Sequence, residues 1–319
     1  MRRKPKAPPA PLPQRAGIDP VRLRLPDDGR WATVRDHLVE RLPALGAPRI
    51  DAMLAGGGIV GTDGPLAPDA PFAPGGYLWF YRPLATEVPV PFAVEVLYQD
   101  ETVLVVDKPH FLSTTPRGRH VTETALVRLR RDLRLPTLSP AHRLDRLTAG
   151  VVMFVVRPEH RGAYQSLFQE RQVRKEYEAI APYVPGLGLP ARVRNRIVKE
   201  RGVIAAREVP GPPNSDSRIA LIEHRDGLGR YRLVPVTGRT HQLRLHMSGL
   251  GIPILGDPVY PVVTDPPPDD FGRPLQLLAR TLEFTDPVTG EHRRFVSRRT
   301  LGAWADHPAW SAGPGPAGG

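Results

Sequence analysis

One short loop holds the densest group of residues that could carry out chemistry. It runs Ala141-His-Arg-Leu-Asp-Arg-Leu-Thr-Ala-Gly150 and directly precedes an apolar segment at residues 151–156. Charged side chains beside a core strand cost free energy unless they are used or paired. Asp145 is therefore a candidate catalytic carboxylate. By spacing alone, the simpler interpretation is a solvated turn with a structural histidine and an Arg–Asp pair.

The composition excludes several kinds of chemistry. The 319-residue chain contains no cysteine, which rules out disulfides, thiolate catalysis, cysteine-ligated zinc and iron–sulfur clusters. We expect a reducing, cytoplasmic setting. No apolar stretch approaches the roughly 18 residues of a membrane span, and the basic start is followed by prolines instead of an apolar signal core. The sequence thus predicts no membrane association.

The charge balance favours a nucleic-acid partner. The formal net charge is +11, and only five of the 44 basic residues are lysines. Guanidinium groups bind phosphate through a planar fork and stack on bases, so an arginine excess suits RNA. A GC-rich codon bias is an alternative source of the arginine-to-lysine ratio. That bias does not set how many acidic residues accompany the arginines, so it leaves the net charge unexplained.

The chain divides into five segments by composition. Residues 1–16 are rich in proline and basic residues and should form a disordered arm. Residues 17–82 predict a small module of two helices followed by strands, and the proline-spaced residues 83–91 predict a linker. Residues 92–305 predict one α+β domain with a mixed, largely antiparallel central sheet flanked by helices. Residues 306–319 should be a flexible tail.

Local patterns predict the elements that position the loop. A capping box at Thr33 and Asp36 opens a helix in the small module. In the large domain, we expect strands at 94–98, 103–106 and 151–156, helices at 122–133 and 161–171, and a hairpin at 218–224 and 231–236. The loop with Asp145 therefore lies at the entry to a buried strand.

Four motifs in the same order resemble those of the RluA-type pseudouridine synthases. The loop at His142-Arg-Leu-Asp145 is similar to the catalytic HRLD motif of that family, and Lys175-Glu-Tyr-Glu-Ala179 to its K-x-Y-x-A segment. Thr237-Gly-Arg-Thr-His-Gln-Leu-Arg-Leu-His246 resembles the TGRTHQLR-x-H segment, and a Gly-Asp-x-x-Tyr run ends at Tyr260. The resemblance covers residues 92–298 and implies the pseudouridine synthase fold.

The resemblance also implies roles for individual residues. Asp145 takes the position of the essential carboxylate, with Arg244 as the arginine that keeps it ionised. Tyr177 stacks on the uracil, and Arg143 fills the gap that the flipped base leaves. Expected RNA-binding residues are Arg143, His142, Arg146, Arg239, His241 and Gln242, although His241 and Gln242 could mainly shape their loop. The reaction needs no metal or other cofactor, and His241 and His246 are not expected to bind metal.

Three features depart from the family pattern or match it weakly. Ala149 replaces a serine, which removes one hydroxyl beside the active loop. Residues 110–119 replace the glycine-containing segment of the family and are expected to line the approach of the RNA. The small module at 17–82 is similar in outline to an S4 RNA-binding domain, with a modest basic face from Arg35, Arg41 and Arg49.

Three functions remain as alternatives. The first is an RNA pseudouridine synthase that acts as a monomer on structured RNA, with ribosomal RNA favoured over transfer RNA. The second is a catalytically silent RNA-binding or ribosome-assembly protein of the same fold. The third is a glycosidase, which normally needs two carboxylates about 5 to 10 Å apart. Asp257 is the nearest candidate for a second carboxylate.

Overall fold

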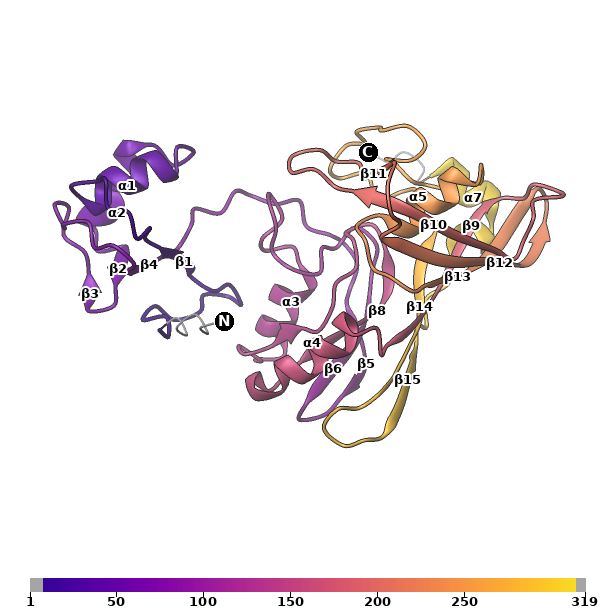
Figure 1. Cartoon of the computed structure of the whole chain (residues 1–319), viewed down its shortest axis with the longest axis horizontal. Helices are drawn as coiled ribbons and strands as arrows, with labels where there is room; N and C mark the ends of the chain where they lie inside the picture. Colours follow the sequence, from indigo (N-terminus) through magenta and orange to yellow (C-terminus); the bar gives the residue numbers. More distant parts are fainter. Residues whose placement is uncertain (1–7, 314–319) are drawn as a thin grey trace, which may run out of the picture. The chain divides into compact units, whose positions relative to one another are not determined.

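The computed structural model describes residues 8–313 and divides into two compact units, Met1–Thr86 and Glu87–Gly319 (Figure 1). The boundary falls within the proline-spaced segment 83–91, where the chain forms no helix or strand. Within the described residues, none of the helices has the length and apolar character needed to cross a bilayer.

The first unit is a small sheet with two helices. Its elements are β1 (Val21–Arg24), α1 (Val34–Arg41), α2 (Ala47–Ala55), β2 (Ile59–Gly61), β3 (Gly64–Pro65) and β4 (Tyr77–Phe80). The capping box predicted at Thr33 and Asp36 is present at the start of α1. The sheet has the order β1-β4-β2-β3. The strand β1 was not predicted from the sequence; it has four residues between prolines and aspartates and pairs with β4.

The second unit is built on one large sheet with the strand order β11-β10-β12-β13-β9-β14-β8-β6-β5. Within the described part of the chain, all of its pairs are antiparallel except β14 with β8, so the predicted α+β class is confirmed. The strands are β5 (Glu95–Gln99), β6 (Val103–Lys108), β7 (Ser139–Pro140), β8 (Ala149–Val155), β9 (Arg174–Pro182), β10 (Ala191–Val198), β11 (Arg207–Val209), β12 (Ser215–Arg225), β13 (Leu228–Pro235), β14 (Leu277–Thr285) and β15 (His292–Val296).

Helices cover both faces of this sheet. They are α3 (Ala125–Asp132), α4 (Arg161–Gln169), α5 (Gln242–Gly249), α6 (Gly302–Ala305) and α7 (His307–Ala312). On β6, Leu104 and Val106 belong to the core cluster of α3, whereas Val103 and Val105 belong to that of α4. Successive strand residues point to opposite faces, so these two helices lie on opposite sides of the sheet. The helix α5 packs against β9, β12 and β13.

The C-terminal segment differs from the flexible tail predicted for 306–319. Residues 307–312 form α7, which begins with Asp306 as its N-cap. Trp310 of this helix packs against the apolar cluster that contains Leu278 and Leu301. The packing of this apolar ring against the core explains why residues 307–312 form a helix. Residues 314–319 lie outside the described part of the chain. The predicted arm at 1–16 is described only from residue 8.

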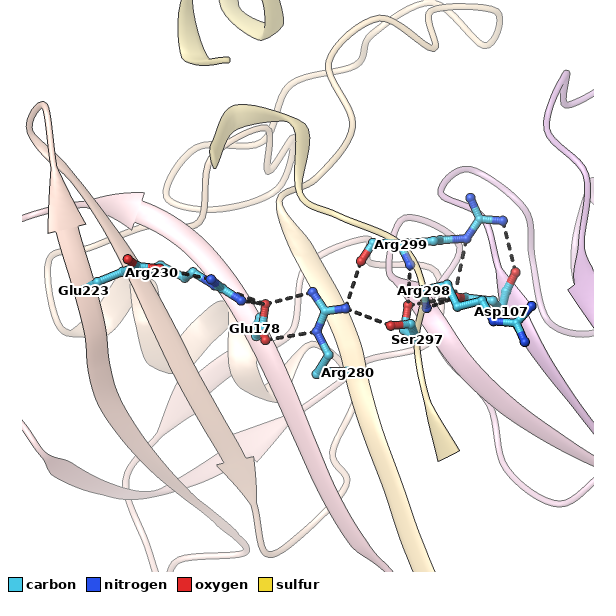
Figure 2. A network of polar contacts seen from close by, with 8 residues as sticks. All are labelled: Asp107, Glu178, Glu223, Arg230, Arg280, Ser297, Arg298 and Arg299. Atoms are coloured by element: carbon cyan, nitrogen blue, oxygen red, sulfur yellow. Dashed lines mark hydrogen bonds and ion pairs between the residues drawn. The ribbon is translucent and has the colours of Figure 1, made fainter. Parts of the chain in front are cut away.

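A polar network joins strands on one face of the sheet (Figure 2). Glu178 of β9 accepts hydrogen bonds from Arg230 of β13 and from Arg280 of β14, at 2.9 Å each for the shortest contacts. Arg280 donates in turn to the carbonyl oxygens of Ser297 and Arg299. Because Glu178 follows Tyr177 on the same strand, the network lies on the face opposite to the Tyr177 ring and fixes the strand that carries it.

Candidate active site

A cleft of about 940 Å³ opens in the second unit, and it brings together residues from all the motifs. Each of the nine site residues expected from the sequence contributes to its lining: His142, Arg143, Asp145, Arg146, Tyr177, Arg239, His241, Gln242 and Arg244. Ser113, Thr114, Arg117 and Arg119 also line it, so the divergent segment 110–119 does border the cleft.

Hydrogen bonds from outside hold the Asp145 loop in shape. The Thr114 hydroxyl donates to the carbonyl oxygen of Leu144 at 2.8 Å and accepts from the amide of the same residue at 3.1 Å. His110 Nδ1 lies 2.7 Å from the carbonyl oxygen of Leu147. The buried Lys108 amine donates to the carbonyl oxygen of Arg146 at 3.3 Å. Residues 108–114 therefore hold the backbone on both sides of Asp145 in the sequence, at Leu144 and at Arg146 and Leu147.

Lys108 supports the site from the protein interior, a role that was not predicted from the sequence. Its amine also donates to the carbonyl oxygens of Pro109 and Leu112, at 2.9 and 2.7 Å. Burial lowers the pKa of Lys108 to about 7, although the charge of Asp145 opposes this shift. The only sequence signal for this role is the pair Lys108-Pro109 after an apolar strand. The three carbonyl oxygens that accept from the Lys108 amine are brought together by the folded structure.

The Asp145 carboxylate has no bonded partner in the part of the chain that the structure describes. Among residues 8–313, its half-buried side chain forms no hydrogen bond or ion pair. Its negative charge nevertheless acts on Tyr177, His241 and Arg244. The carboxylate is therefore available to a substrate while it is surrounded by groups that respond to its charge.

The direct partner of Arg244 is Asp257, which corrects the expected pairing of Arg244 with Asp145. Arg244 Nε and Nη2 donate to the two carboxylate oxygens of Asp257, at 2.8 and 2.5 Å. Burial disfavours the charged guanidinium, but the bonds to Asp257 outweigh burial and raise the pKa of Arg244. Arg244 therefore stays positive and acts on Asp145 through space. This also leaves Asp257 engaged and unsuited as a glycosidase carboxylate.

The Tyr177 ring forms part of the cleft lining, and it packs with apolar residues of the two core clusters that meet below the cleft. Burial, and then the charge of Asp145, raise the pKa of Tyr177 well above its ordinary value. The hydroxyl thus stays protonated at neutral pH. An aromatic face with a protonated hydroxyl next to the carboxylate suits a planar, polar base.

Two residues expected to bind RNA serve the protein's own structure instead. His142 Nε2 accepts the amide of Met153 at 3.2 Å, and its ring stacks on Phe168 at 4.4 Å. The buried Gln242 amide donates to the Asp216 carbonyl and Ser217 hydroxyl and accepts from Thr237 and Arg239. The His142 Nε2 atom and both polar atoms of the Gln242 amide are thus bonded within the protein, so both residues shape the cleft walls. Their side-chain types alone could not separate the two roles.

The other expected RNA-binding residues keep donors at the cleft surface. Arg143 and Arg239 are exposed, and Arg146 is half-buried. Burial, and then the charge of Arg119, lower the pKa of Arg146. His241 is the N-cap residue of α5, and its Nδ1 lies 3.2 Å from the Tyr260 hydroxyl. Burial lowers the pKa of His241 to about 4. The cleft is thus lined by arginines, with few negative charges.

Ala149, which replaces the serine of the family motif, lies in an apolar environment. Ala149 is fully buried, and it packs in the cluster with Ile180, Leu278 and Leu301. A methyl group fits this apolar site. Within the described residues, no group of three or more histidine, cysteine, aspartate or glutamate side chains could hold a metal ion.

Comparison with known proteins gives the class that this fold and cleft define. A sequence model of the family described as RNA pseudouridylate synthase matches residues 102–249. The chain is 32% identical over 220 residues to the "Dual-specificity RNA pseudouridine synthase RluA" of Haemophilus influenzae, which covers 64% of this chain and 93% of that protein. The chain therefore belongs to the RNA pseudouridylate synthase family, whose members are isomerases.

Further relatives agree. The protein of the same name from Escherichia coli K12 is 32% identical over 213 residues, with 63% of this chain and 90% of that protein covered. Among solved structures, "Human RNA Pseudouridylate Synthase Domain Containing 4" is similar with a TM-score of 0.52 and 25% identity, over 70% of this chain and 94% of that one. The expected family and reaction class are thus confirmed.

Proposed function

We propose that this isomerase converts a specific uridine within structured RNA to pseudouridine, with Asp145 as the reacting carboxylate. The observation that carries the proposal is a carboxylate in an arginine-lined cleft, near an aromatic ring and a fixed guanidinium, that has no bonded partner among residues 8–313. We favour ribosomal RNA over transfer RNA as the substrate. The relatives named dual-specificity synthases make transfer RNA the second substrate to test.

In the proposed reaction, the target nucleotide is flipped out of its stack into the cleft. Flipping costs a few kcal/mol, and the exposed Arg143 guanidinium fills the vacated space. The N1–C1′ bond breaks, the uracil turns, and a C5–C1′ bond forms while the C5 proton is released and N1 is protonated. No atom is gained or lost. Asp145 serves as the nucleophile or the base in this exchange, and Tyr177 restricts the detached uracil.

Arg244 has a supporting role in this proposal. Asp257 takes the Nε and Nη2 donors on one edge of the Arg244 guanidinium, so Arg244 is held in place by Asp257 and not by Asp145. Its positive charge still attracts the negative charge of Asp145 through space. Arg146 and Arg239 contact phosphates beside the flipped nucleotide.

We also propose a division of labour between the two units. Residues 17–82 form an S4-like module that contributes RNA affinity, residues 83–91 are a linker, and residues 92–305 are the catalytic domain. The protein acts as a monomer in the cytoplasm. The silent RNA-binding alternative is disfavoured, because a silent relative would be free to lose Asp145, Tyr177 or Arg244.

The experiment compares the wild-type protein with Asp145→Asn on unmodified ribosomal and transfer RNA transcripts, with pseudouridine measured by mass spectrometry. Asp145→Asn should abolish conversion while RNA affinity stays within about twofold. The exposed Asp132→Asn is the matched control and should retain full activity. Conversion by Asp145→Asn would refute its role, and RNA binding without conversion by the wild type would favour the silent alternative.

A further inference from the structure

A second basic surface lies on the face of the sheet opposite to the cleft. On β13, Leu233 is opposite Tyr177 of β9 and Ile219 of β12, and these side chains share the cleft side of the sheet with α5. Neighbouring strand residues point the other way. The opposite face therefore carries the exposed side chains of Arg192, Arg194, Arg218 and Arg232, which we call the arginine face.

The strand register brings these arginines close together. Arg192 of β10 is directly opposite Arg218 of β12, and Arg232 of β13 is opposite the next same-face residue, Ala220. Same-face positions along a strand are about 6.6 Å apart, and adjacent strands are about 4.8 Å apart. Like charges directly opposite each other destabilise a sheet. Four guanidinium groups at this density call for negative charge from outside the protein.

The protein supplies only part of that negative charge. Asp216 pairs with Arg192 at 2.6 Å and lies 3.8 Å from Arg194, whose side chains remain 53% and 57% exposed. In the part of the chain that the structure describes, Arg218 and Arg232 form no ion pair. Glu178 lies opposite Arg232, but its carboxylate already pairs with Arg230 and Arg280, so the arginine face keeps a surplus of positive charge. Val234 and Ala220, which lie opposite Arg218 and Arg232, are half-buried.

We infer that the arginine face binds the phosphate backbone of the same RNA, at a distance from the modified nucleotide. Guanidinium forks bind phosphates at two points, and rows of them on a flat sheet suit an extended chain of phosphates. The inference rests on the proposed function only for the identity of the RNA.

The sheet edge connects the two surfaces. The strands β10 and β11 form that edge, and the connection between them, residues 199–206, carries Ile204 at the cleft lining. The same connection presents the exposed Arg201. An RNA that leaves the cleft past Ile204 can therefore pass around the edge to Arg194 and Arg192. A short stem-loop that fills only the cleft would not reach them.

The test is a quadruple variant, Arg192→Gln, Arg194→Gln, Arg218→Gln and Arg232→Gln, compared with a control that removes four exposed arginines elsewhere. The control changes Arg131, Arg157, Arg294 and Arg298 to glutamine, so the two variants have the same net charge. Both are first checked for wild-type thermal unfolding. Binding is then measured against salt for a long ribosomal RNA transcript and for short stem-loops cut from it, in an Asp145→Asn background that separates binding from turnover.

The variant of the arginine face should bind the long transcript about tenfold more weakly at moderate salt, and its log–log salt slope should fall by about 2 to 3. The control variant and binding of the short stem-loops should change less than twofold. Unchanged affinity and slope for the long transcript would overturn the inference. Polyglutamate serves as a probe for an acidic protein partner. If the variant of the arginine face lost binding to polyglutamate but bound RNA like the wild type, the inference would also be overturned, because the face would then bind an acidic protein. If the wild-type protein had no synthase activity, the proposed function would be refuted. The binding results would still show whether the arginine face binds RNA.

Discussion

Arg244 of α5 and Asp257 form a two-point ion pair whose side chains are only 3% and 1% exposed. The Asp257 carboxylate also accepts the amides of Val259 and Tyr260, at 2.8 and 3.2 Å. A buried guanidinium held on one edge by a carboxylate cannot rotate freely. Arg244 therefore presents a fixed positive charge to the cleft, and the charge acts on Asp145 without a bond that would block it.

Asp257→Asn should damage both stability and turnover. The substitution keeps the size of the side chain but leaves Arg244 as a buried charge without its counter-ion, which costs about 3 kcal/mol of unfolding free energy. The freed guanidinium can also bond Asp145, so single-turnover rates should fall at least about tenfold. Denaturant unfolding and single-turnover assays measure the two effects.

The matched control for Asp257 is Asp51→Asn. Asp51 pairs with Arg35 at 2.5 Å, but both side chains are exposed by more than a third. Exposed pairs contribute about 0 to 1 kcal/mol, so this variant should unfold much like the wild type. Equal losses in the two variants would show that burial of the Arg244 pair has no special energetic role.

Gly150→Ala should prevent the second unit from folding stably. Gly150 has φ +113°, and an added Cβ would lie 2.2 Å from the carbonyl oxygen of Ala279 on β14. This contact occurs where β8 and β14 pair in parallel, directly after the Asp145 loop. Backbone atoms cannot move aside as a flexible side chain can, so we expect a loss above about 4 kcal/mol or insoluble protein.

The control glycine is Gly227 in the β12–β13 turn. It also has a positive φ, +75°, but open space surrounds the position of an added Cβ. Gly227→Ala should therefore cost only about 1 to 2 kcal/mol, the strain of a left-handed residue. If Gly150→Ala and Gly227→Ala lost the same unfolding free energy, the close approach of β14 to Gly150 would not be the cause of the destabilisation.

Much of the fold and site was predictable because the signals are local. Apolar runs marked β6 and β8, and motif spacing marked Asp145, Tyr177 and Arg244, which all line one cleft. The strand β1 escaped prediction because four residues carry too weak an alternation. Its order depends on β4, more than 50 residues away.

The roles of polar side chains were less predictable, because their partners are distant in sequence. Arg244 and Asp257 are separated by 13 positions, and Glu178 and Arg280 by 102. Gln242 and His142 sit in motifs that suggest RNA contact, yet their polar atoms bond to the protein's own strands. Side-chain type and spacing locate a site, whereas the allocation of each hydrogen bond follows from the folded structure.

Thr114→Val should loosen the Asp145 loop. The substitution keeps the shape of a buried side chain but removes both hydrogen bonds to the backbone of Leu144, the neighbour of Asp145. Leaving those groups unsatisfied costs about 1 to 3 kcal/mol, and turnover should fall about tenfold or more as the carboxylate loses its position. Thermal unfolding and single-turnover rates test this. Thr137→Val, which removes one exposed hydrogen bond to Val156, should change neither measurably.

The half-buried His142 should make the protein less stable in acid. Burial, and then the charge of Lys175, lower the pKa of His142 to about 3, against about 6.5 in an unfolded chain. Between these values the unfolded state binds a proton that the folded state does not. The unfolding free energy should therefore fall as the pH drops below about 6.5, by up to about 1.4 kcal/mol per pH unit for this one group. Above pH 6.5 the residue contributes no pH dependence.

The variant His142→Gln isolates this effect from that of His110 and His246. Burial lowers the pKa of His110 and of His246 to about 4, so they add slopes of the same sign in every variant. Denaturant unfolding between pH 4 and 7 measures how the unfolding free energy falls with pH. The fall should be shallower for His142→Gln than for the wild type, by the slope that corresponds to the uptake of up to one proton on unfolding. The exposed His224→Gln should follow the wild-type curve. Parallel curves for His142→Gln and the wild type would mean that His142 is protonated in the folded protein, which its bond from the Met153 amide forbids.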